Sequence, residues 1–387
     1  MIPCAVVASR GARRWEQGHP WIFRSDVEAP PAAPAGAVRV RDTRGRELGW
    51  ALWSPASEIS LRRLDANPDT AIDGEWWYRR LTAAVARRAA TARDATAYRL
   101  VHGEGDALPA LVVDQYDRWL VAQLLSAGVE AFRAEITDAL RTITGCQGIL
   151  ARNDPPVRTR EGLPRVVEAL YGEVPHDIVV EEHGIRYHAA PHTGQKTGAF
   201  LDQRENRVLA AAHAHGRALD LFSYHGSFAL HLARRATSVT AVDSSAAAIE
   251  RAAVNAELNA LSNIEFVEAD AFDFLRERRG GPRFDTIVVD PPAFAKNRAS
   301  LQGAIRGYRD LNVHAMRLLA PGGMIFTASC SYHLGKAAFL DMLRDAAAAS
   351  GRTLVLRAIT AQPADHPEVI TAPETGYLKG ALLEAID

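Results

Sequence analysis

The sequence predicts an α/β protein: a doubly wound, seven-stranded domain in the carboxyl-terminal half, preceded by a β-rich module and a small α+β domain. Two observations support this fold class. From Gly216 onward, short apolar strands alternate with helical segments as far as Asp387, which is the pattern of a doubly wound sheet. Residues 36–54 instead alternate apolar and polar side chains on both sides of a Thr-Arg-Gly turn, which indicates a half-buried hairpin.

The length and composition limit the classes of protein to consider. A chain of 387 residues is expected to form two or three domains of roughly 100 to 200 residues each. No apolar run approaches the ~18 residues that a membrane span needs, and the first residues lack the pattern of a secretion signal. The three cysteines, Cys4, Cys146 and Cys330, are far apart and form no CxxC pair. We therefore expect a soluble cytoplasmic protein without disulfide bonds, a metal site or a membrane segment.

The β-rich module, expected over residues 1–68, carries an excess of positive charge. Residues 1–63 contain 10 Arg against 6 Asp and Glu, whereas the rest of the chain has 35 basic and 40 acidic residues. Arg13 and Arg14 lie close in sequence to Trp21, and arginines beside aromatic rings can hold phosphates and stack bases. Tryptophan is more often part of a core, so nucleic-acid binding and simple packing both stay open here.

The middle domain is expected over residues 72–182, and the sequence pattern does not indicate its function. Its expected elements are an Ala- and Arg-rich helix at 74–93, two or three strands within 98–125, a helix at 131–142, an irregular polar stretch at 152–163 and a hairpin at 178–190 that turns at His183 and Gly184.

A strand-turn-helix-strand unit of nucleotide-binding type follows in the last domain, expected over residues 183–387. A strand at 218–222 leads through a turn at 223–227 into a helix, and the next strand ends on Asp243. An acid about 20 residues past such a turn is placed to accept hydrogen bonds from a ribose diol. Gly226 lacks the flanking glycines that a pyrophosphate requires, which favours S-adenosylmethionine. The alternative is an ordinary strand-helix connection.

Acids end the neighbouring strands as well. Because ligands of open α/β sheets bind outside the carboxyl ends of the strands, these side chains are expected to converge on one site. The predicted cofactor-binding residues are Asp220, Phe222, Tyr224, Gly226, Asp243, Asp270 and Asp290.

The loop at 192–209, which contains Lys196, leads into this unit. One interpretation is that it wraps a bound nucleotide or covers the site. The other is a solvated loop followed by a helix that Asp202 caps.

Two motifs carry the chemistry. Cys330 follows a strand and stands between two serines, near the Asp290-Pro291-Pro292 motif. A thiolate there could add to carbon 6 of a pyrimidine and activate carbon 5 for methylation, although a lone cysteine is more often a buried hydrophobe. The rigid Asp-Pro-Pro backbone and Phe294 suit a flat heterocycle. Amino methyltransferases use a similar motif, so this motif alone leaves nitrogen and carbon methylation open.

Over nearly its whole length the chain closely resembles the ribosomal large-subunit methyltransferase I family, whose members make 5-methylcytosine in 23S rRNA. The matching pieces are HPWIF, GRELGWALWSPASEISLR, ARNDPPVRTREGL, GQKTGAFLDQRENR, DLFSYHGSFAL, DPPAFAKN, RGYRDLN, SCS and YLKG. The resemblance implies a PUA domain at the amino terminus, S-adenosylmethionine as methyl donor and Cys330 as nucleophile. We add Asp290 as its catalytic partner.

The residues expected to contact RNA are Arg13, Arg14, Trp21, Lys196, Pro291, Pro292 and Phe294. The sequence departs from the family pattern at His225 and Ser227 in the first turn and at Ala293 after Asp-Pro-Pro. The first two bear on cofactor affinity and the third on substrate contacts.

Two rival functions stay open: methylation of an exocyclic amine, as in 2-methylguanine, and a non-catalytic role in ribosome assembly. The sequence is compatible with a homodimer. It does not reveal which cytosine is modified, whether the substrate is free rRNA or an assembling subunit, or which base removes the carbon 5 proton.

Overall fold

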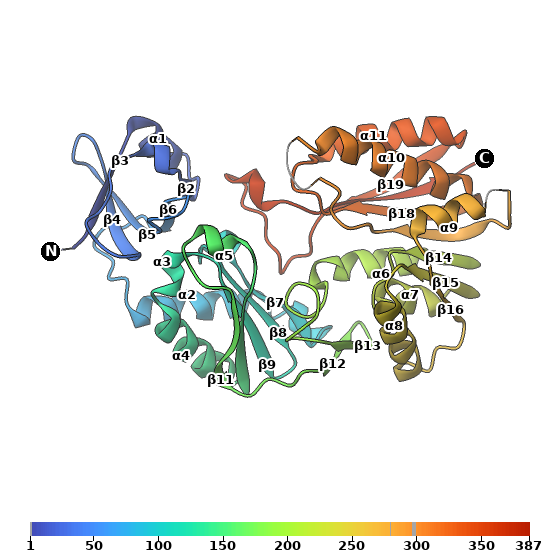
Figure 1. The fold of residues 1–387 in the computed structure, drawn as a ribbon, viewed down its shortest axis with the longest axis horizontal. Helices are drawn as coiled ribbons and strands as arrows, with labels where there is room; N and C mark the ends of the chain where they lie inside the picture. The colour runs from blue at the N-terminus through green and yellow to red at the C-terminus, as the bar shows by residue number, and fades with distance from the viewer. Residues whose placement is uncertain (1, 279, 296–298) are drawn as a thin grey trace. The chain divides into compact units, whose positions relative to one another are not determined.

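The computed structural model describes residues 2–278, 280–295 and 299–387 (Figure 1). The end of the DPPAFAKN motif, Lys296 and Asn297, lies outside the described residues. The chain divides into two compact units, and each contains segments from distant parts of the sequence. Unit 1 consists of Met1–Val180, Ala189–Leu201 and Ala364–Thr375, and unit 2 of Glu181–His188, Asp202–Pro363 and Gly376–Asp387.

Unit 1 begins with a six-stranded sheet in the order β2-β6-β5-β4-β1-β3. The expected hairpin is confirmed, because β4 and β5 pair antiparallel around the turn at residues 43–45. Helix α1 packs Trp15 onto the sheet beside Val7 and Val40. The elements are β1 (Cys4–Val7), α1 (Ser9–Glu16), β2 (Trp21–Ile22), β3 (Val27–Ala29), β4 (Gly36–Asp42), β5 (Glu47–Trp53) and β6 (Leu61–Asp65).

A second sheet of unit 1 has five strands in the order β11-β10-β9-β8-β7. Its core also contains Trp50 and Leu64 of the first sheet, packed with Trp76 and Trp77 of α2, so the two sheets share one hydrophobic core. The elements are α2 (Gly74–Arg87), β7 (Ala97–His102), β8 (Leu111–Tyr116), β9 (Trp119–Leu124), α3 (Ala127–Glu130), α4 (Arg133–Thr144), β10 (Gly148–Asn153), α5 (Val157–Arg160) and β11 (Val166–Gly172).

Two parts of this region differ from the sequence expectation. Helix α2 stops at Arg87 instead of Arg93, and Thr91–Arg93 form a separate 3-10 turn. The stretch at 152–163, expected to be irregular, contains helix α5. The hairpin at 178–190 is confirmed as β12 (Ile178–Glu182) and β13 (Ile185–Ala189). The domain bounds 1–68, 72–182 and 183–387 stay predictions.

Unit 2 contains the predicted seven-stranded sheet, in the order β16-β15-β14-β17-β18-β20-β19. Its strands are parallel except β20, which pairs antiparallel with both neighbours. The strands are β14 (Arg217–Leu221), β15 (Ser238–Asp243), β16 (Ile264–Glu268), β17 (Phe284–Val289), β18 (Leu319–Ser329), β19 (Leu354–Thr360) and β20 (Lys379–Ala385).

Helices cover both faces of this sheet, which confirms the doubly wound class (Figure 1). Successive residues of a strand point to opposite faces, so Leu219 packs in a cluster with α9, α10 and α11, and Ala218 in a cluster with α6 and α7. The helices are α6 (Arg204–Ala212), α7 (Ser227–Ala233), α8 (Ala246–Leu258), α9 (Ala271–Glu277), α10 (Leu301–Arg317) and α11 (Lys336–Ser350).

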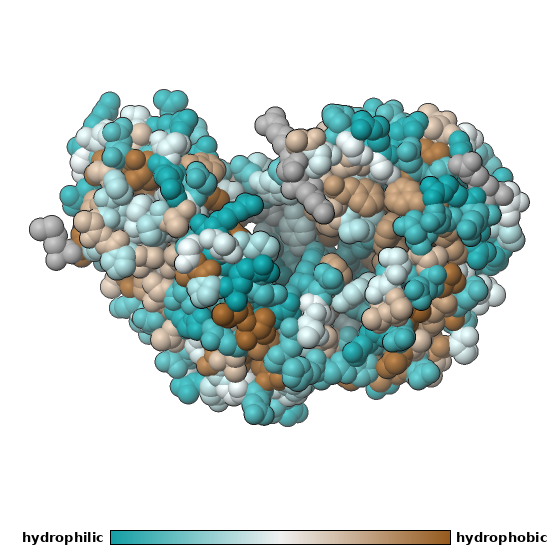
Figure 2. All heavy atoms as spheres, viewed as in Figure 1, coloured by the Kyte–Doolittle hydropathy of each residue, from teal (hydrophilic) through white to brown (hydrophobic). Residues whose placement is uncertain are grey.

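On the face shown in Figure 2, hydrophilic side chains predominate and hydrophobic ones are scattered among them. Among the described residues, no helix has the length and apolar character that crossing a membrane requires. The same residues contain no group of three or more His, Cys, Asp and Glu side chains arranged to hold a metal ion.

Candidate active site

The turn that follows β14 has an unusual backbone. Phe222 and Tyr224 adopt left-handed conformations with φ of 63° and 49°, and Gly226 has φ of 84° where α7 begins. Such conformations cost about 1 to 3 kcal/mol in residues other than glycine and gather at ligand sites. A Cβ atom on Gly226 would lie 3.0 Å from the Cβ of Ala252. The turn is therefore held in one shape against α8.

Asp243 lies beside this turn, at the end of β15. Its two carboxylate oxygens accept hydrogen bonds from the backbone N–H groups of Tyr224 and Ser245, each at 2.9 Å. A carboxylate oxygen has two lone pairs, so each oxygen keeps one for a further donor. This half-buried carboxylate is thus oriented by the turn and retains capacity for two ligand hydroxyls.

Asp220, at the carboxyl end of β14, is 1% exposed. Its Oδ2 accepts a hydrogen bond from the N–H of Ala229 at 2.9 Å, whereas Oδ1 has no hydrogen-bond partner among the described residues. Burial raises the pKa of this carboxyl well above its usual range, and the negative charges of Asp290 and Asp243 raise it further. Asp220, Asp243 and Asp290 therefore lie close enough to interact electrostatically, as the sequence predicted. Oδ1 of Asp220 lacks a hydrogen-bond donor among the described residues.

Asp270 has a structural explanation. It is exposed, and its Oδ1 accepts hydrogen bonds from the N–H groups of Phe272 and Asp273, so it caps the amino terminus of α9. Capping of this kind contributes about 0.5 to 2 kcal/mol to helix stability without any ligand. Its predicted contact with a cofactor stays a prediction.

Asp290 follows directly after β17 and is oriented by Gln203, the residue before α6. The side-chain amide of Gln203 donates to Asp290 Oδ1 at 2.8 Å, and Asn206 donates to the amide oxygen of Gln203 at 2.5 Å. Sequence reasoning missed Gln203, because no pattern within residues 192–209 indicates which side chain reaches another strand. Its signal was only its place in the motif GQKTGAFLDQRENR.

Cys330 follows β18, the parallel neighbour of β17, and Val289 pairs with Thr327 in the ladder. Cys330 and Asp290 therefore leave adjacent strands at the same edge. Cys330 is partly buried against the cluster that contains Ala328.

A hydroxyl network joins the Ser-Cys-Ser and Asp-Pro-Pro segments. The hydroxyl of Tyr308 lies 2.8 Å from Ser331 Oγ and 3.3 Å from the carbonyl oxygen of Pro292, and accepts a hydrogen bond from the N–H of Phe294. The Phe294 ring is half-buried against the Tyr308 ring, with centroids 4.5 Å apart. Pro291 is buried, whereas Pro292 is exposed. Tyr308 thus fixes the motif next to Cys330.

Lys379, the first residue of β20, is a second site residue that sequence reasoning missed. It is 3% exposed, and its Nζ donates to the carbonyl oxygens of Ser331 at 2.7 Å and Tyr377 at 2.8 Å. Burial lowers the pKa of its ammonium to about 8, against the opposing effect of negative charge on Cys330.

Two of the three departures from the family pattern, His225 and Ser227, flank Gly226. His225 is buried, stacks on Tyr187 with ring centroids 5.1 Å apart, and its carbonyl oxygen accepts a hydrogen bond from Asn255. Ser227 begins α7, and Ala293 is exposed. The buried His225 side chain thus packs against Tyr187 next to the turn.

The residues predicted to contact RNA through the amino-terminal module have different surroundings. Arg13 is exposed and lines a cavity of about 430 Å³ together with Arg44 and Arg46. Arg14 lies over the Phe23 ring, 4.7 Å from its centroid. Trp21 is half-buried, and its indole N–H donates to Glu104 Oε1 at 2.7 Å. This hydrogen bond orients the Trp21 ring within unit 1, and its contact with RNA stays a prediction.

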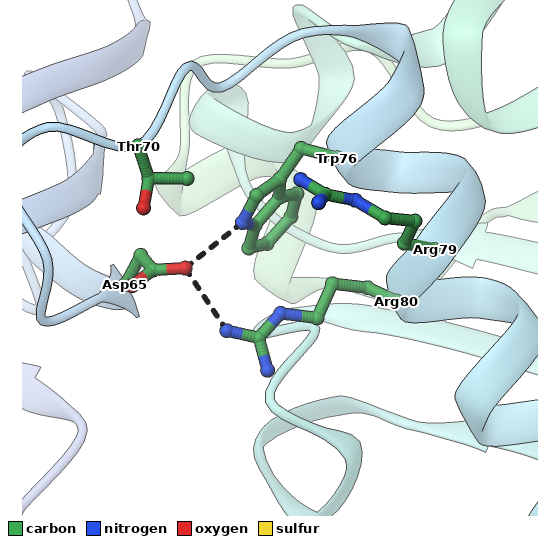
Figure 3. Close-up of a pocket in the computed structure, with 5 residues that line it drawn as sticks. All are labelled: Asp65, Thr70, Trp76, Arg79 and Arg80. Carbon is green, nitrogen blue, oxygen red and sulfur yellow. Dashed lines mark hydrogen bonds and ion pairs between the residues drawn. The ribbon is translucent and has the colours of Figure 1, made fainter.

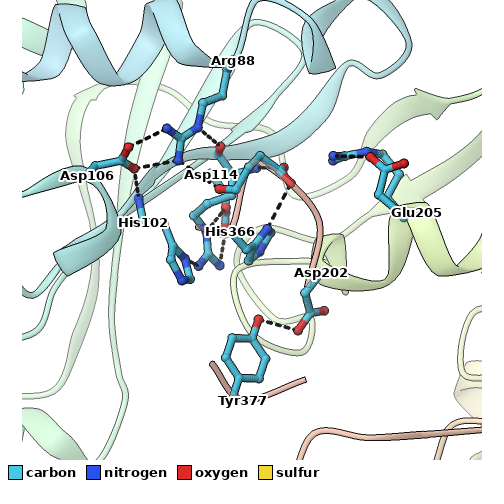
Figure 4. A network of polar contacts seen from close by, with 11 residues as sticks. Arg88, His102, Asp106, Asp114, Asp202, Glu205, His366 and Tyr377 are labelled. Atoms are coloured by element: carbon cyan, nitrogen blue, oxygen red, sulfur yellow. Dashed lines mark hydrogen bonds and ion pairs between the residues drawn. The ribbon is translucent and has the colours of Figure 1, made fainter. Parts of the chain in front are cut away.

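Lys196 lies in a loop of unit 1, with its Nζ 4.8 Å from the centroid of the Phe200 ring. Thr197 fixes this loop by a hydrogen bond to Asp114 at 2.5 Å. Helix α6 begins at Arg204 without a side-chain cap, so the expected cap at Asp202 is wrong. Asp202 instead accepts a hydrogen bond from the hydroxyl of Tyr377 at 2.7 Å (Figure 4).

A further pocket of unit 1, of about 300 Å³, is lined by Asp65, Thr70, Trp76, Arg79 and Arg80 (Figure 3). Asp65 Oδ2 accepts hydrogen bonds from the indole N–H of Trp76 and from Arg80, each at 3.1 Å. Burial favours a higher pKa of Asp65, but hydrogen bonds from Asn67, Trp76 and Arg80 outweigh it, so the pKa is lowered. Asp65, the last residue of β6, is thus linked by hydrogen bonds to Trp76 and Arg80 of α2.

Comparisons with known proteins agree with this geometry. The profile of the S-adenosylmethionine-dependent methyltransferase family matches residues 98–383, and that of the PUA-like domain matches residues 6–66. Ribosomal RNA large subunit methyltransferase I of Tolumonas auensis is 41% identical over 379 residues, which cover 95% of this chain and 96% of the relative. The chain belongs to this methyltransferase family. The Aeromonas salmonicida relative of the same name is 40% identical, with 95% of each chain covered.

Solved structures show the same fold. A methyltransferase complexed with SAH has a TM-score of 0.85 at 22% identity, covering 99% of this chain and all of the other. A structure described as a SAM-dependent methyltransferase from Streptococcus mutans has a TM-score of 0.83 at 22% identity, with the same coverage.

S-adenosylmethionine is the cofactor of this methyltransferase, and the residues present fit it. Asp243 keeps acceptor capacity for the two ribose hydroxyls, and the buried Oδ1 of Asp220 lacks a donor. The turn at Gly226 contains no phosphate-binding glycine series, in agreement with a cofactor that carries no phosphate.

Proposed function

We propose that this rRNA methyltransferase forms 5-methylcytosine in 23S ribosomal RNA through a covalent adduct on Cys330. The observation that carries the proposal is the position of Cys330 at the end of β18, on the strand next to the one that Asp290 follows. Carbon 5 of cytosine is a poor nucleophile until a thiolate adds to carbon 6, so such an enzyme needs a cysteine at this edge. Cys4 and Cys146 belong to unit 1. The ribosomal RNA substrate is the one in the relatives' names.

Each residue has a chemical role in this proposal. The Sγ of Cys330 forms a bond to carbon 6, while Asp290 holds a proton at ring nitrogen 3, where negative charge would otherwise develop. The bound cofactor supplies an electrophilic methyl group for carbon 5. Loss of the carbon 5 proton then breaks the sulfur–carbon bond and releases Cys330. Gln203 supports this role by orienting Asp290.

The decisive experiment compares wild type with Cys330→Ala and, as a control, Cys4→Ala. We expect Cys330→Ala to abolish methyl transfer and keep cofactor binding by calorimetry, and Cys4→Ala to stay active. RNA that contains 5-fluorocytosine should trap a covalent complex with wild type only, because the carbon 5 proton needed for release is missing. If Cys330→Ala still makes 5-methylcytosine at a normal rate, the proposal is wrong.

The same experiment separates the two rival functions. A 2-methylguanine product without an adduct would indicate methylation of an exocyclic amine. Cofactor binding without any methyl transfer to ribosomal RNA or to assembling subunits would indicate an assembly factor.

RNA affinity is proposed to come from the amino-terminal module. Arg13 and Arg44 line the 430 Å³ cavity, and neither has an ion-pair partner within the described part of the chain. Each phosphate that an arginine neutralises adds about 0.9 to the slope of log affinity against log salt for duplexes and about 0.7 for single strands.

For the double variant Arg13→Ala, Arg44→Ala we expect weaker RNA binding and a salt slope reduced by about 1.4 to 1.8. The control is Arg41→Ala, because Arg41 is already paired with Glu47. Filter binding at several salt concentrations measures both quantities. An unchanged slope in the double variant would place the phosphate contacts elsewhere.

A further inference from the structure

Lys379 is an unusual lysine for its position. It begins β20 and pairs with Ser329 of β18, so it lies beside the strand that leads into Cys330. Its side chain is buried, and its Nζ donates to the backbone carbonyls of Ser331 and Tyr377. The ammonium is therefore directed to the residues that follow the end of β18.

Within the part of the chain that the structure describes, the Lys379 ammonium has no carboxylate counter-ion. Among the described residues its hydrogen-bond acceptors are the two backbone carbonyls, and no Asp or Glu oxygen lies within ion-pair distance of Nζ. A buried charge is costly unless an opposite charge accompanies it. Cys330 directly precedes Ser331, and a negative charge on its sulfur would raise the pKa of Lys379. With a pKa of about 8, Lys379 is still mostly protonated at pH 7.

We propose that Lys379 is the counter-ion that holds Cys330 as a thiolate before RNA binds. This inference rests on the proposed function, in which Cys330 is the nucleophile. The thiol proton leaves to solvent and Lys379 keeps its three protons, so no other bond changes. When the adduct breaks down, the same ammonium stabilises the departing thiolate. Lys379 is thus a positioning residue that acts through the Sγ of Cys330.

The experiment measures the rate at which iodoacetamide alkylates Cys330 as a function of pH, by mass spectrometry of the peptide that contains it. Neither RNA nor cofactor is present. For wild type we expect a midpoint below the value of about 8.5 of an ordinary thiol. Lys379→Met should raise the midpoint by at least one pH unit and lower the rate at pH 7 about tenfold. Lys379→Arg keeps the charge and should keep most of the shift.

The matched control is Lys336→Met. Lys336 also acts electrostatically on Lys379, but it is exposed, so water screens its charge. We expect its removal to leave the midpoint nearly unchanged. Calorimetric binding of S-adenosylhomocysteine verifies that each variant is folded.

A purely structural role would leave the alkylation profile unmoved. An equal midpoint in wild type and folded Lys379→Met would overturn the proposal, and so would a wild-type midpoint at or above 8.5, even if no variant folds. Failure of the proposed function is a separate result: it would appear as normal methylation by Cys330→Ala, whatever the alkylation profile.

Discussion

Buried carboxylates differ in whether an arginine accompanies them, and unit 2 contains both kinds, because Glu182 is paired with Arg207 there. In unit 1, Arg88 and Asp106 form a bidentate pair with both distances at 2.6 Å (Figure 4). Arg99 pairs with Asp114 in the same way. In unit 2, Asp220 is equally buried, yet it has no ion pair within the described residues and one oxygen lacks a hydrogen bond. Removing one partner of a buried pair leaves the other charge uncompensated, whereas an acid without an arginine leaves a place for a ligand.

Arg88 and Arg99 also form hydrogen bonds to Asp365, in a segment that is distant in sequence, residues 364–375. Arg88 donates to the carbonyl oxygen of Asp365, and the carboxylate of Asp365 accepts the backbone N–H of Arg99, each at 2.9 Å. Burial, with the positive charge of Arg99 adding to it, lowers the pKa of His102 to about 2, so this neighbour stays neutral. Residues 364–375 are thereby part of unit 1.

The largest effect, on the free energy of unfolding, is expected from removing one partner of the buried Arg88–Asp106 ion pair. Asp106→Ala leaves Arg88 buried without its carboxylate, which should lower the free energy of unfolding by about 3 to 5 kcal/mol. All seven tryptophans precede residue 120, so urea unfolding followed by tryptophan fluorescence reports on unit 1 alone.

Glu75→Ala is the control, because Glu75 forms an exposed pair with Arg79 at 3.9 Å. It should change the free energy of unfolding by less than about 0.5 kcal/mol. Equal effects of Asp106→Ala and Glu75→Ala would show that the buried pair contributes nothing beyond a surface pair.

A smaller effect, on cofactor binding and not on stability, is expected from a substitution of Asp243, which lies near Asp220. Asp243→Asn removes the charge that would accept the ribose hydroxyls but keeps an oxygen for one backbone N–H. Loss of charge-assisted hydrogen bonds should cost about 1.5 to 3 kcal/mol of cofactor affinity, or about tenfold to a hundredfold in Kd by calorimetry. Glu268→Gln, on the exposed end of β16, is the control. Unchanged affinity in Asp243→Asn would remove Asp243 from the site.

The smallest effect concerns Asp220 and depends on pH. Its pKa is raised in the folded protein, so the folded state binds the proton more tightly and loses stability as pH rises above the unfolded value of about 3.9. Asp220→Asn has no proton to lose. Relative to wild type without cofactor, it should therefore gain stability as pH rises above about 3.9 in scanning calorimetry, while its cofactor affinity falls. A stability difference that does not change with pH would contradict the raised pKa.

Local patterns in the sequence determined much of this protein. The alternation of side chains predicted the hairpin of β4 and β5, and the succession of apolar strands and helices predicted the seven-stranded sheet. Because parallel strands end at a common edge, the order of the chain sufficed to bring Asp220, Asp243 and Asp290 together. These features depend on periodicity and connection, which neighbouring residues encode.

The tertiary structure decided what depends on contacts between residues far apart in the chain. Arg88 pairs with Asp106, 18 positions later, and no local pattern indicates that partner. Asp202 bonds Tyr377 instead of capping α6, and Gln203 reaches Asp290. Nothing in the sequence distinguishes Lys379 from other lysines in strands, and only the β18–β20 ladder places it opposite Ser329, the residue before Cys330. Propensity and periodicity act over a few residues, whereas a buried charge selects its partner through the fold, so a single sequence does not reveal which distant group it will meet.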